Sequence, residues 1–428
     1  MAKSRAEEPA RTLKGFRDFL PADKRARDVV QDRLVEVFRR HGFEPVETPT
    51  IEYASLILGK YGDEADRLVY AFDDAGQRRV ALPYDQTVPT ARVLAQYRNE
   101  LPRYFRRYAI RNVFRAEKPQ KGRYREFTQC DIDVFGSGSA IADAEIVACT
   151  YFAFVNVGFT DFRIKINDRR TLVAAVEPFA AGVSAGSIVQ SIDKLDKMPR
   201  EKVIDELTRK GLAADGAARA LDADVRTPPS PALREVLDAS RELGVPDETL
   251  EYAPTLARGL DYYTGPIFEV VAPALGLGSL AGGGRYDELI ERLGGPDTPA
   301  VGLAFGFDRI VDGARQLGLV AECGGGSQVL VTVFDESTRA ASLSIAAELR
   351  RAGIRTEVHP GVDRLGRQMK LADQKKIAVV VVVGPDEAKA GAAIVKDMAT
   401  GDQKAVERSR LAVEIAGVLG VGSIAPLP

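Results

Sequence analysis

Hydrophobic residues near the N-terminus recur with a helical period. They fall at i, i+4, i+7 and i+8, which places four of them on one face: Val30, Leu34, Val37 and Phe38. This spacing predicts an amphipathic helix over residues 22–41, which Gly42 ends. Residues 43–51 follow and contain Pro45 and Pro49. Because proline cannot donate to a strand ladder, we expect this extended piece at a sheet edge or an interface.

Polar and apolar residues alternate over residues 107–134, which predicts two strands joined by a polar turn at 118–123. Alternate residues share a face on each strand: Arg111, Val113, Arg115 and Glu117 on the first, and Phe127, Gln129, Asp131 and Asp133 on the second. A solvated sheet face accounts for one such row. Two polar rows on adjoining strands could instead form the floor of a charged cleft.

The pattern changes further along the chain. Residues 170–250 are rich in Ala, Lys, Asp and Glu at helical spacing, with a proline-rich break at 227–231, and are predicted to form a helical insertion. Strand-like sequence returns at 266–272, and the glycines at 324–326 resemble a linker. Beyond them we expect strands at 329–334, 354–358, 377–383 and 392–398, with helices at 338–352 and 363–376. Alternating elements of this kind predict a small domain with a mixed sheet.

Length and composition narrow the class of protein. At roughly 150 residues per domain, the 428 residues suggest two or three domains. Three scattered cysteines and two distant histidines, His41 and His359, exclude a disulfide framework and a histidine-rich metal centre, and argue against a Ser-His-Asp triad. Residues 1–14 are charged and lack the apolar core of a signal peptide, and the longest apolar run, 377–383, is too short to span a bilayer. We expect a cytoplasmic enzyme with no membrane partner.

The formal net charge of -2 argues against a wholly basic nucleic-acid binder, but it conceals a local patch. Residues 103–125 hold nine basic side chains against the single acid Glu117. Arginine presents a planar fork that matches phosphate. The patch therefore indicates a nucleotide or nucleic-acid site, with a solvated basic hairpin as the alternative.

Two glycine-rich segments and one tyrosine-rich segment stand out. The segment 282–286, Gly-Gly-Gly-Arg-Tyr, lacks the spacing of dinucleotide or P-loop motifs, so a turn or a close-packing site explains it as well. The glycines of 302–309 would let a strand pack closely under a ligand, with Arg309 at the start of the next helix. In 258–265, Arg258 and two tyrosines could contact a planar or polar ligand, or the tyrosines could be a buried pair at a turn.

The order of these segments resembles that of the histidyl-tRNA synthetase family, within the class II aminoacyl-tRNA synthetases, over nearly the whole chain. Leu82–Pro89 resembles the amino-acid-binding segment of that family. Phe114–Glu117 with Gly122–Phe127 resembles class II motif 2, Gly302–Arg309 motif 3, and the helix running to Pro49 motif 1. Those motifs identify the class, whereas Arg258–Tyr263 is characteristic of the histidine enzymes.

The resemblance implies an α/β (α+β) fold. A class II antiparallel-sheet catalytic domain would span residues 1–325, with a helical insertion at about 170–250, and a mixed α/β anticodon-binding domain would span 326–428. It implies an ATP-dependent, AMP-forming histidine–tRNA ligase. Such an enzyme activates L-histidine with ATP to histidyl-adenylate and transfers it to the 3′ end of tRNA(His). Class II motif 1 also implies a homodimer.

The resemblance further implies residue roles. Arg115 would bind the α-phosphate of ATP and the substrate carboxylate, and Arg309 the γ-phosphate, while Arg123 assists and Glu117 accepts from the adenine amino group. Arg258 would stabilise negative charge on the α-phosphate without a protein nucleophile.

Asp85, Thr87 and Gln129 would bind the α-ammonium group of histidine. Asp133 and Tyr263 would bind the two imidazole nitrogens, with Tyr262 also in the pocket. Glu269 matches an acidic position that can hold Mg²⁺. Candidate RNA contacts on a helix of the last domain are Arg364, Arg367 and Lys370, although a solvated helix face explains each one equally well.

Four positions depart modestly from the family pattern. Asp85 and Asp133 are shorter by one methylene than the glutamates of some members, Gln86 replaces an often apolar residue, and Thr128 stands where His or Tyr is common. The main alternative is a catalytically silent paralogue, such as the regulatory subunit of the first histidine-biosynthesis enzyme, which typically lacks the last domain and has eroded motifs. Another class II synthetase would lack the 258–263 segment, and a generic nucleic-acid-binding module would not explain Asp85, Asp133 and Tyr263.

Overall fold

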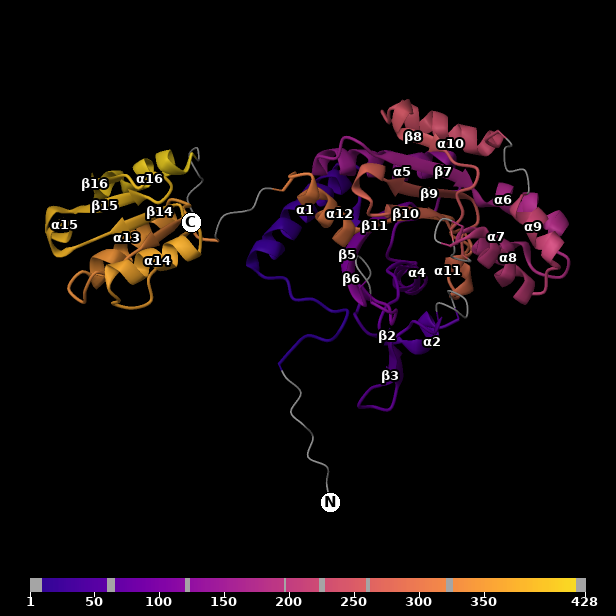
Figure 1. Cartoon of the computed structure of the whole chain (residues 1–428), viewed down its shortest axis with the longest axis horizontal. Helices are drawn as coiled ribbons and strands as arrows, with labels where there is room; N and C mark the ends of the chain where they lie inside the picture. Colours follow the sequence, from indigo (N-terminus) through magenta and orange to yellow (C-terminus); the bar gives the residue numbers. More distant parts are fainter. Residues whose placement is uncertain are drawn as a thin grey trace, which may run out of the picture. The chain divides into compact units, whose positions relative to one another are not determined.

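The computed structural model describes residues 10–59, 66–119, 124–195, 198–222, 228–258, 262–320 and 326–420. Contacts divide the chain into two compact units. The first comprises the N-terminal residues to Asp18 and then Arg27–Val320, and the second comprises Phe19–Ala26 with the residues from Ala321 onward. Each unit contains a sheet of its own (Figure 1).

The first unit is built on an eight-stranded sheet of order β1-β5-β6-β11-β10-β9-β7-β8. Its strands are β1 (Glu44–Pro45), β5 (Phe105–Phe114), β6 (Glu126–Phe135), β7 (Arg163–Asp168), β8 (Leu250–Tyr252), β9 (Pro266–Val271), β10 (Ser279–Arg285) and β11 (Ala300–Gly306). All neighbours pair antiparallel except the outermost pairs, β1 with β5 and β7 with β8. The predicted antiparallel sheet is confirmed, and the segment with Pro45 does form an edge strand.

One face of this sheet is apolar and covered by helices. Register places Tyr108, Ile132, Leu303 and Phe268 in one row across it, each at most 7% exposed. The covering helices include α1 (Pro21–Arg40), α5 (Ala140–Val157) and α12 (Phe307–Gln316). The Phe38 ring of α1 lies 5.7 Å from the Tyr108 ring and 5.4 Å from the Phe305 ring, which confirms the predicted helix and its buried face.

The α5 helix is a core element that the sequence pattern did not predict, because its sequence is apolar nearly all round and shows no amphipathic period. In the described part of the chain, it alone is long and apolar enough to cross a membrane by length and composition. However, 61% of it is buried inside the protein, and it packs on α10 (Pro231–Glu242) and on the sheet. These contacts are those of a core helix.

Short helices follow β7, as expected for this alanine-rich and charged stretch. They are α6 (Arg169–Val176), α7 (Ala185–Ile192), α8 (Arg200–Arg209) and α9 (Ala214–Leu221), followed by α10 and two 3₁₀ turns, η1 (Glu177–Phe179) and η2 (Asp247–Thr249). Helices α6 to α9 pack on one another at one end of the unit (Figure 1). Serines cap two of the helices: Ser184 accepts from the Ser187 N–H, and Ser230 from the Leu233 N–H.

A small three-stranded sheet lies between α1 and β5 in the chain. It consists of β2 (Glu52–Tyr53), β3 (Ala71–Asp73) and β4 (Arg79–Ala81), with α2 (Ala54–Ile57) and α4 (Thr87–Gln96) beside it. These elements were not predicted, because the strands are only two or three residues long and show no clear period.

The second unit has a mixed five-stranded sheet of order β13-β12-β14-β15-β16, parallel over its first three strands. The strands are β12 (Val329–Val331), β13 (Thr356–Val358), β14 (Val379–Val382), β15 (Ala392–Asp397) and β16 (Gln403–Glu407). The helices are α13 (Arg339–Arg351), α14 (Leu365–Gln374), α15 (Pro385–Ala390) and α16 (Leu411–Leu419). Val329 packs in the cluster of α13 and α16, and Leu330 in that of α14, so both sheet faces are covered. The predicted mixed sheet is confirmed, with α15, β16 and α16 in addition.

One local prediction is wrong. Strand β5 ends at Phe114, and Glu117 does not continue the row of Arg111 and Val113. The Arg115 N–H still donates to the Arg125 carbonyl at 2.9 Å, but the next N–H, that of Ala116, donates to the Leu68 carbonyl at 2.8 Å. The glycines of 282–284 lie within strand β10 and form no turn, so the alternative of a close-packing site is confirmed.

Candidate active site

The sheet face opposite the apolar face carries polar and very small residues. Register places one row across it from Ala109 through Asp131, Ala304 and Gly282 to Glu269. Arg107 and Arg111 on β5 lie opposite Asp133 and Gln129 on β6, so the two predicted polar rows do meet. Gln129, Asp131, Asp133 and Arg107 are each at most 8% exposed, which excludes a solvated sheet face. We call this surface the polar face.

Asp133 is held by two protein partners on the polar face. Its Oδ2 lies 2.6 Å from Arg107 Nη2, and its Oδ1 accepts a hydrogen bond from the Tyr286 hydroxyl. Burial raises the pKa of Asp133, and Arg107 and the Tyr286 hydroxyl oppose that rise. A methyl group on Gly302 would lie only 1.8 Å from Oδ1, so the carboxylate needs a glycine beneath it.

Asp85 lies at the start of α4 and is 4% exposed. Its Oδ1 accepts from the backbone N–H groups of Thr87 and Val88 at 3.0 and 3.1 Å, which ties the carboxylate to the helix N-terminus. Its Oδ2 lies 3.5 Å from the Tyr262 hydroxyl. The Tyr262 and Tyr263 rings lie 4.9 Å apart and are buried. The structure therefore brings together the segment predicted to bind the amino acid and the tyrosine pair.

Arg258 lies directly over strand β10. A methyl group built on Gly282 would fall 1.8 Å from Arg258 Nη1, so only glycine leaves room for the guanidinium. Glu269 Oε1 on the neighbouring strand lies 3.8 Å from the same nitrogen. Burial lowers the pKa of Arg258, but nearby Tyr263 and Glu269 outweigh that effect and raise it. A permanent positive charge is thus fixed over the polar face.

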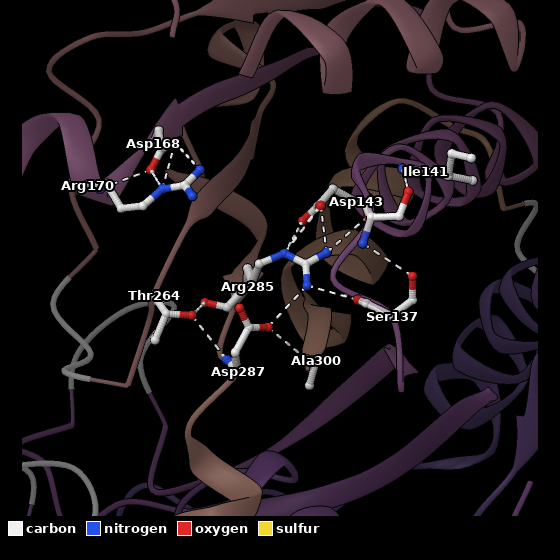
Figure 2. A network of polar contacts seen from close by, with 10 residues as sticks. Ser137, Ile141, Asp143, Asp168, Arg170, Thr264, Arg285, Asp287 and Ala300 are labelled. Atoms are coloured by element: carbon white, nitrogen blue, oxygen red, sulfur yellow. Dashed lines mark hydrogen bonds and ion pairs between the residues drawn. The ribbon is translucent and has the colours of Figure 1, made fainter. Parts of the chain in front are cut away.

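A network of polar contacts around Arg285 holds Thr264, the residue that follows Tyr263 (Figure 2). Arg285, at the end of β10, pairs with Asp143 at the start of α5, with 2.6 Å between Nη2 and Oδ2. It also donates to the Ser137 carbonyl at 2.9 Å and pairs with Asp287 at 3.1 Å. The Asp287 N–H donates to the Thr264 hydroxyl, and the Thr264 N–H donates to the Arg285 carbonyl. The network therefore anchors the residue that follows Tyr263.

Two arginines lie at the ends of strands that border the polar face. Arg115 follows β5, where its guanidinium stacks 4.2 Å from the Tyr84 ring centroid and its Nε donates to the Tyr84 carbonyl at 3.2 Å. Arg309 lies in the first turn of α12, directly after β11, and its Nη1 donates to the Ser279 carbonyl at 2.8 Å. The predicted glycine-to-helix junction is confirmed. The backbone carbonyl of Glu117 accepts from Arg125 Nε at 3.0 Å, which ties together the two sides of the segment after β5.

The remaining predicted residues lie elsewhere. Arg123 and residues 259–261 lie outside the described residues. Arg364, Arg367 and Lys370 lie in the second unit, exposed at and along the start of α14. Arg367 Nη1 lies 3.4 Å from Asp363 Oδ1.

Sequence reasoning missed Arg107, Tyr286 and Arg285 as parts of the site. Arg107 falls in the basic patch, and Arg285 and Tyr286 follow the Gly282–Gly284 run. The sequence patterns therefore identified the segments that contain these residues, but not the contacts that the residues make. Only the folded structure reveals the partners, since each pairs with a residue far away in the chain.

For a divalent metal, Glu269 is the one predicted ligand. Within the described ranges no group of three or more His, Cys, Asp and Glu side chains could hold an ion. Mg²⁺ commonly takes one or two carboxylates together with substrate phosphates, so a single glutamate on this face fits an ion that arrives with a nucleotide.

Comparisons with known proteins agree with this geometry. A family model described as "Histidyl-tRNA synthetase" matches residues 15–310, and one described as "Anticodon binding domain" matches residues 328–417. A histidine–tRNA ligase of Wolinella succinogenes is 39% identical over 438 residues, covering 96% of this chain and 99% of that protein. The solved histidyl-tRNA synthetase of Nostoc sp. PCC 7120 has a TM-score of 0.79 and 30% identity, covering 96% of this chain and all of that one. A solved Bacillus halodurans structure shares the fold, with a TM-score of 0.69 and 20% identity over 88% of this chain and 99% of that one. That structure is described as an ATP phosphoribosyltransferase regulatory subunit/histidyl-tRNA synthetase.

Proposed function

This chain belongs to the histidyl-tRNA synthetase family and is a histidine–tRNA ligase that uses ATP, and we propose that the polar face is where its reaction occurs. The observation that carries this proposal is the Arg258 guanidinium over Gly282, between the buried tyrosines and Glu269. A fixed cation on a floor of small residues suits a ligand in which negative charge develops during reaction.

In the first step, the carboxylate of histidine attacks the α-phosphorus of ATP, forms the acyl–phosphate bond and expels pyrophosphate. Arg115 binds the α-phosphate and the carboxylate, and its stacking on Tyr84 fixes the fork in place. Arg309 binds the γ-phosphate from the helix start, Arg123 assists, and Glu117 accepts from the adenine amino group. Arg258 stabilises the charge that builds on the α-phosphate, so no protein nucleophile is required. Glu269 would hold Mg²⁺, which neutralises phosphate charge when bound.

Histidine binds beside these arginines. Asp85, Thr87 and Gln129 receive its α-ammonium group, and Tyr262, Tyr263 and Asp133 border its imidazole ring. Because the polar groups of such a site would remain unpaired beside an apolar side chain, we expect strong rejection of apolar amino acids, on the order of 10⁴-fold.

In the second step, the adenylate passes histidine to the 3′-terminal ribose of tRNA(His), and AMP leaves. We propose that residues 1–325 form the catalytic domain, with an insertion at about 170–250, and that residues 326–428 form the anticodon-binding domain. The separate sheet of the second unit supports this boundary. Arg364, Arg367 and Lys370 are its candidate RNA contacts. A homodimer and a cytoplasmic location complete the proposal.

The regulatory-subunit alternative is disfavoured by the residues themselves. Arg115, Arg258 and Arg309 are all present, and the second unit has its own five-stranded sheet. A subunit without catalysis has no need for three arginines around one polar face.

ATP–pyrophosphate exchange across the twenty amino acids tests the activity. Exchange that depends on histidine alone is the expected result. Exchange with another amino acid, and none with histidine, would contradict the assignment.

A further inference from the structure

Two buried oxygens on strand β6 have neither a hydrogen-bond partner nor an ion-pair partner among the described residues: Gln129 Oε1 and Asp131 Oδ1. The two residues are separated by one position, so both side chains lie on the polar face, about 7 Å apart along the strand. The proposed function gives Gln129 a ligand but leaves Asp131, only 2% exposed, without a role.

The strands beside Asp131 offer it no partner. The residues directly opposite are Ala109 on β5 and Ala304 on β11, whose side chains cannot donate a hydrogen bond. Arg107, a buried cation on the same face, already pairs with Asp133 at 2.6 Å. Burial raises the pKa of Asp131 well above its usual value; Arg107 opposes that rise, and the charges of Asp133 and Asp85 add to it. Because a buried carboxylate is costly without a partner, this position is suited to a bound cation.

We propose that Asp131 is a further histidine-binding residue, whose carboxylate accepts a hydrogen bond from the α-ammonium group of the substrate beside Gln129. The inference rests on the proposed histidine site. An ammonium group carries three N–H donors and a full charge. Two of the donors satisfy Asp131 and Gln129, the third is shared by Asp85 and Thr87, and the charge offsets the Asp131 carboxylate. A neutral imidazole offers a single N–H and no charge. Asp133 is less available for this role, because Tyr286 and Arg107 occupy its two oxygens.

Three ligands separate the possible contacts of Asp131. L-Histidine carries both the ammonium and the ring, histidinol keeps both but lacks the carboxylate, and 3-(imidazol-4-yl)propanoate keeps the ring but lacks the ammonium. Calorimetric titration of the full chain gives a dissociation constant for each without any catalytic turnover. Asp131→Asn should weaken the binding of histidine and of histidinol by roughly 10-fold, and Asp131→Ala should weaken it by roughly 100-fold. Both variants should bind the propanoate within about twofold of wild type.

An equal loss for all three ligands, or no loss for histidine, would overturn the inference. Asp168→Asn is the matched control, since Asp168 is 1% exposed but paired with Arg170 at 2.6 Å, and it should leave all three constants unchanged. Gln129→Ala distinguishes failure of this inference from failure of the proposed histidine site. If Gln129→Ala weakens histidine and the Asp131 variants do not, only the inference fails; if none of them does, the proposed histidine site fails too.

Thermal unfolding without ligand excludes a purely structural role. Removing an unpaired buried charge should leave the melting temperature of Asp131→Asn equal to or above that of the wild type. A clear fall in melting temperature, together with weaker binding of the propanoate, would assign Asp131 to the fold instead and overturn the inference.

Discussion

A methyl group at Gly282 would occupy the place that the Arg258 guanidinium now fills. The ideal Cβ lies 1.8 Å from Nη1, 2.5 Å from Cζ and 2.7 Å from Nη2, whereas ordinary contacts begin near 3.4 Å. Gly282→Ala therefore forces the guanidinium to move by about 1.6 Å. The atoms that must yield are the end of a flexible side chain, so the strand itself can stay in place. Gly284 differs, because its Cβ would meet the Pro266 carbonyl of the backbone at 2.6 Å.

The expected consequence is a loss of catalysis with little loss of stability. A reacting group displaced by about 1 Å, or one lost charge-stabilising donor, commonly slows an enzyme roughly 100-fold. That factor corresponds to about 2.7 kcal/mol of activation free energy. Alanine is no worse than glycine for strand conformation, so we expect the free energy of unfolding to change by less than about 1 kcal/mol.

Histidine-dependent ATP–pyrophosphate exchange measures the effect, with urea unfolding as the stability check. Gly216→Ala is the control, because nothing lies within 4 Å of its Cβ, and it should exchange at the wild-type rate. Arg258→Ala should slow exchange by several orders of magnitude while folding stays intact, and adding Gly282→Ala to it should cost little more, since both remove one interaction. Wild-type exchange by Gly282→Ala would refute the view that Arg258 acts from its position over β10.

Three further outcomes follow from the same geometry. Tyr286→Phe removes the hydroxyl that donates to Asp133, and it should raise KM for histidine roughly 10-fold in steady-state exchange while leaving KM for ATP unchanged; an equal rise in both would contradict the assigned hydrogen bond. Burial raises the pKa of Asp143 from 3.8 to about 6 against the opposing pull of Arg285. The folded state therefore binds the Asp143 proton more tightly than the unfolded state does. The free energy of unfolding, measured in urea, should fall as pH rises from about 4 to about 6 and then level off. Asp143→Asn should remove the part of this pH dependence that comes from Asp143. Replacing Arg364, Arg367 and Lys370 by Gln should weaken tRNA binding and reduce its salt slope by about 1 for each phosphate that is no longer neutralised, with exchange unchanged; an unaltered salt dependence would identify a solvated helix face.

Local periodicity in the sequence was sufficient to predict the helices and strands that bury one or both of their faces. The α1 helix and the β5–β6 pair follow from spacings of 3.6 and 2, and β14 from a run of valines buried on both sides. It failed where strands have two or three residues, as in the sheet of β2, β3 and β4, because so short a segment cannot display a period. It failed also for α5, whose sequence is apolar nearly all round and carries no amphipathic pattern.

The candidate site was predictable as a set of segments and not as a set of contacts. Matching motifs identified Asp85, Arg115, Arg258 and Arg309, which lie on segments with recognisable spacing. The partners of Asp133 had no such signal, because Arg107 lies on β5 and Tyr286 directly after β10, and both meet Asp133 only in the folded sheet. The same holds for Gly282, whose function is to leave space for a residue 24 positions earlier in the sequence.

The basic patch shows why charge density alone is a poor guide to phosphate binding. Arg106 pairs with Glu145 at 3.0 Å, Arg107 with Asp133 at 2.6 Å and Arg111 with Glu47 at 3.1 Å. Arg125 Nε donates to a backbone carbonyl. The first three arginines hold β5 to its surroundings, and their charges are paired within the protein. Arg125 holds the segment after β5 in place. Arg115 differs because the strand ends just before it, where its guanidinium stacks on Tyr84 beside the polar face. Position at a strand end, and not membership of a cluster, therefore makes an arginine of this patch a candidate for binding phosphate.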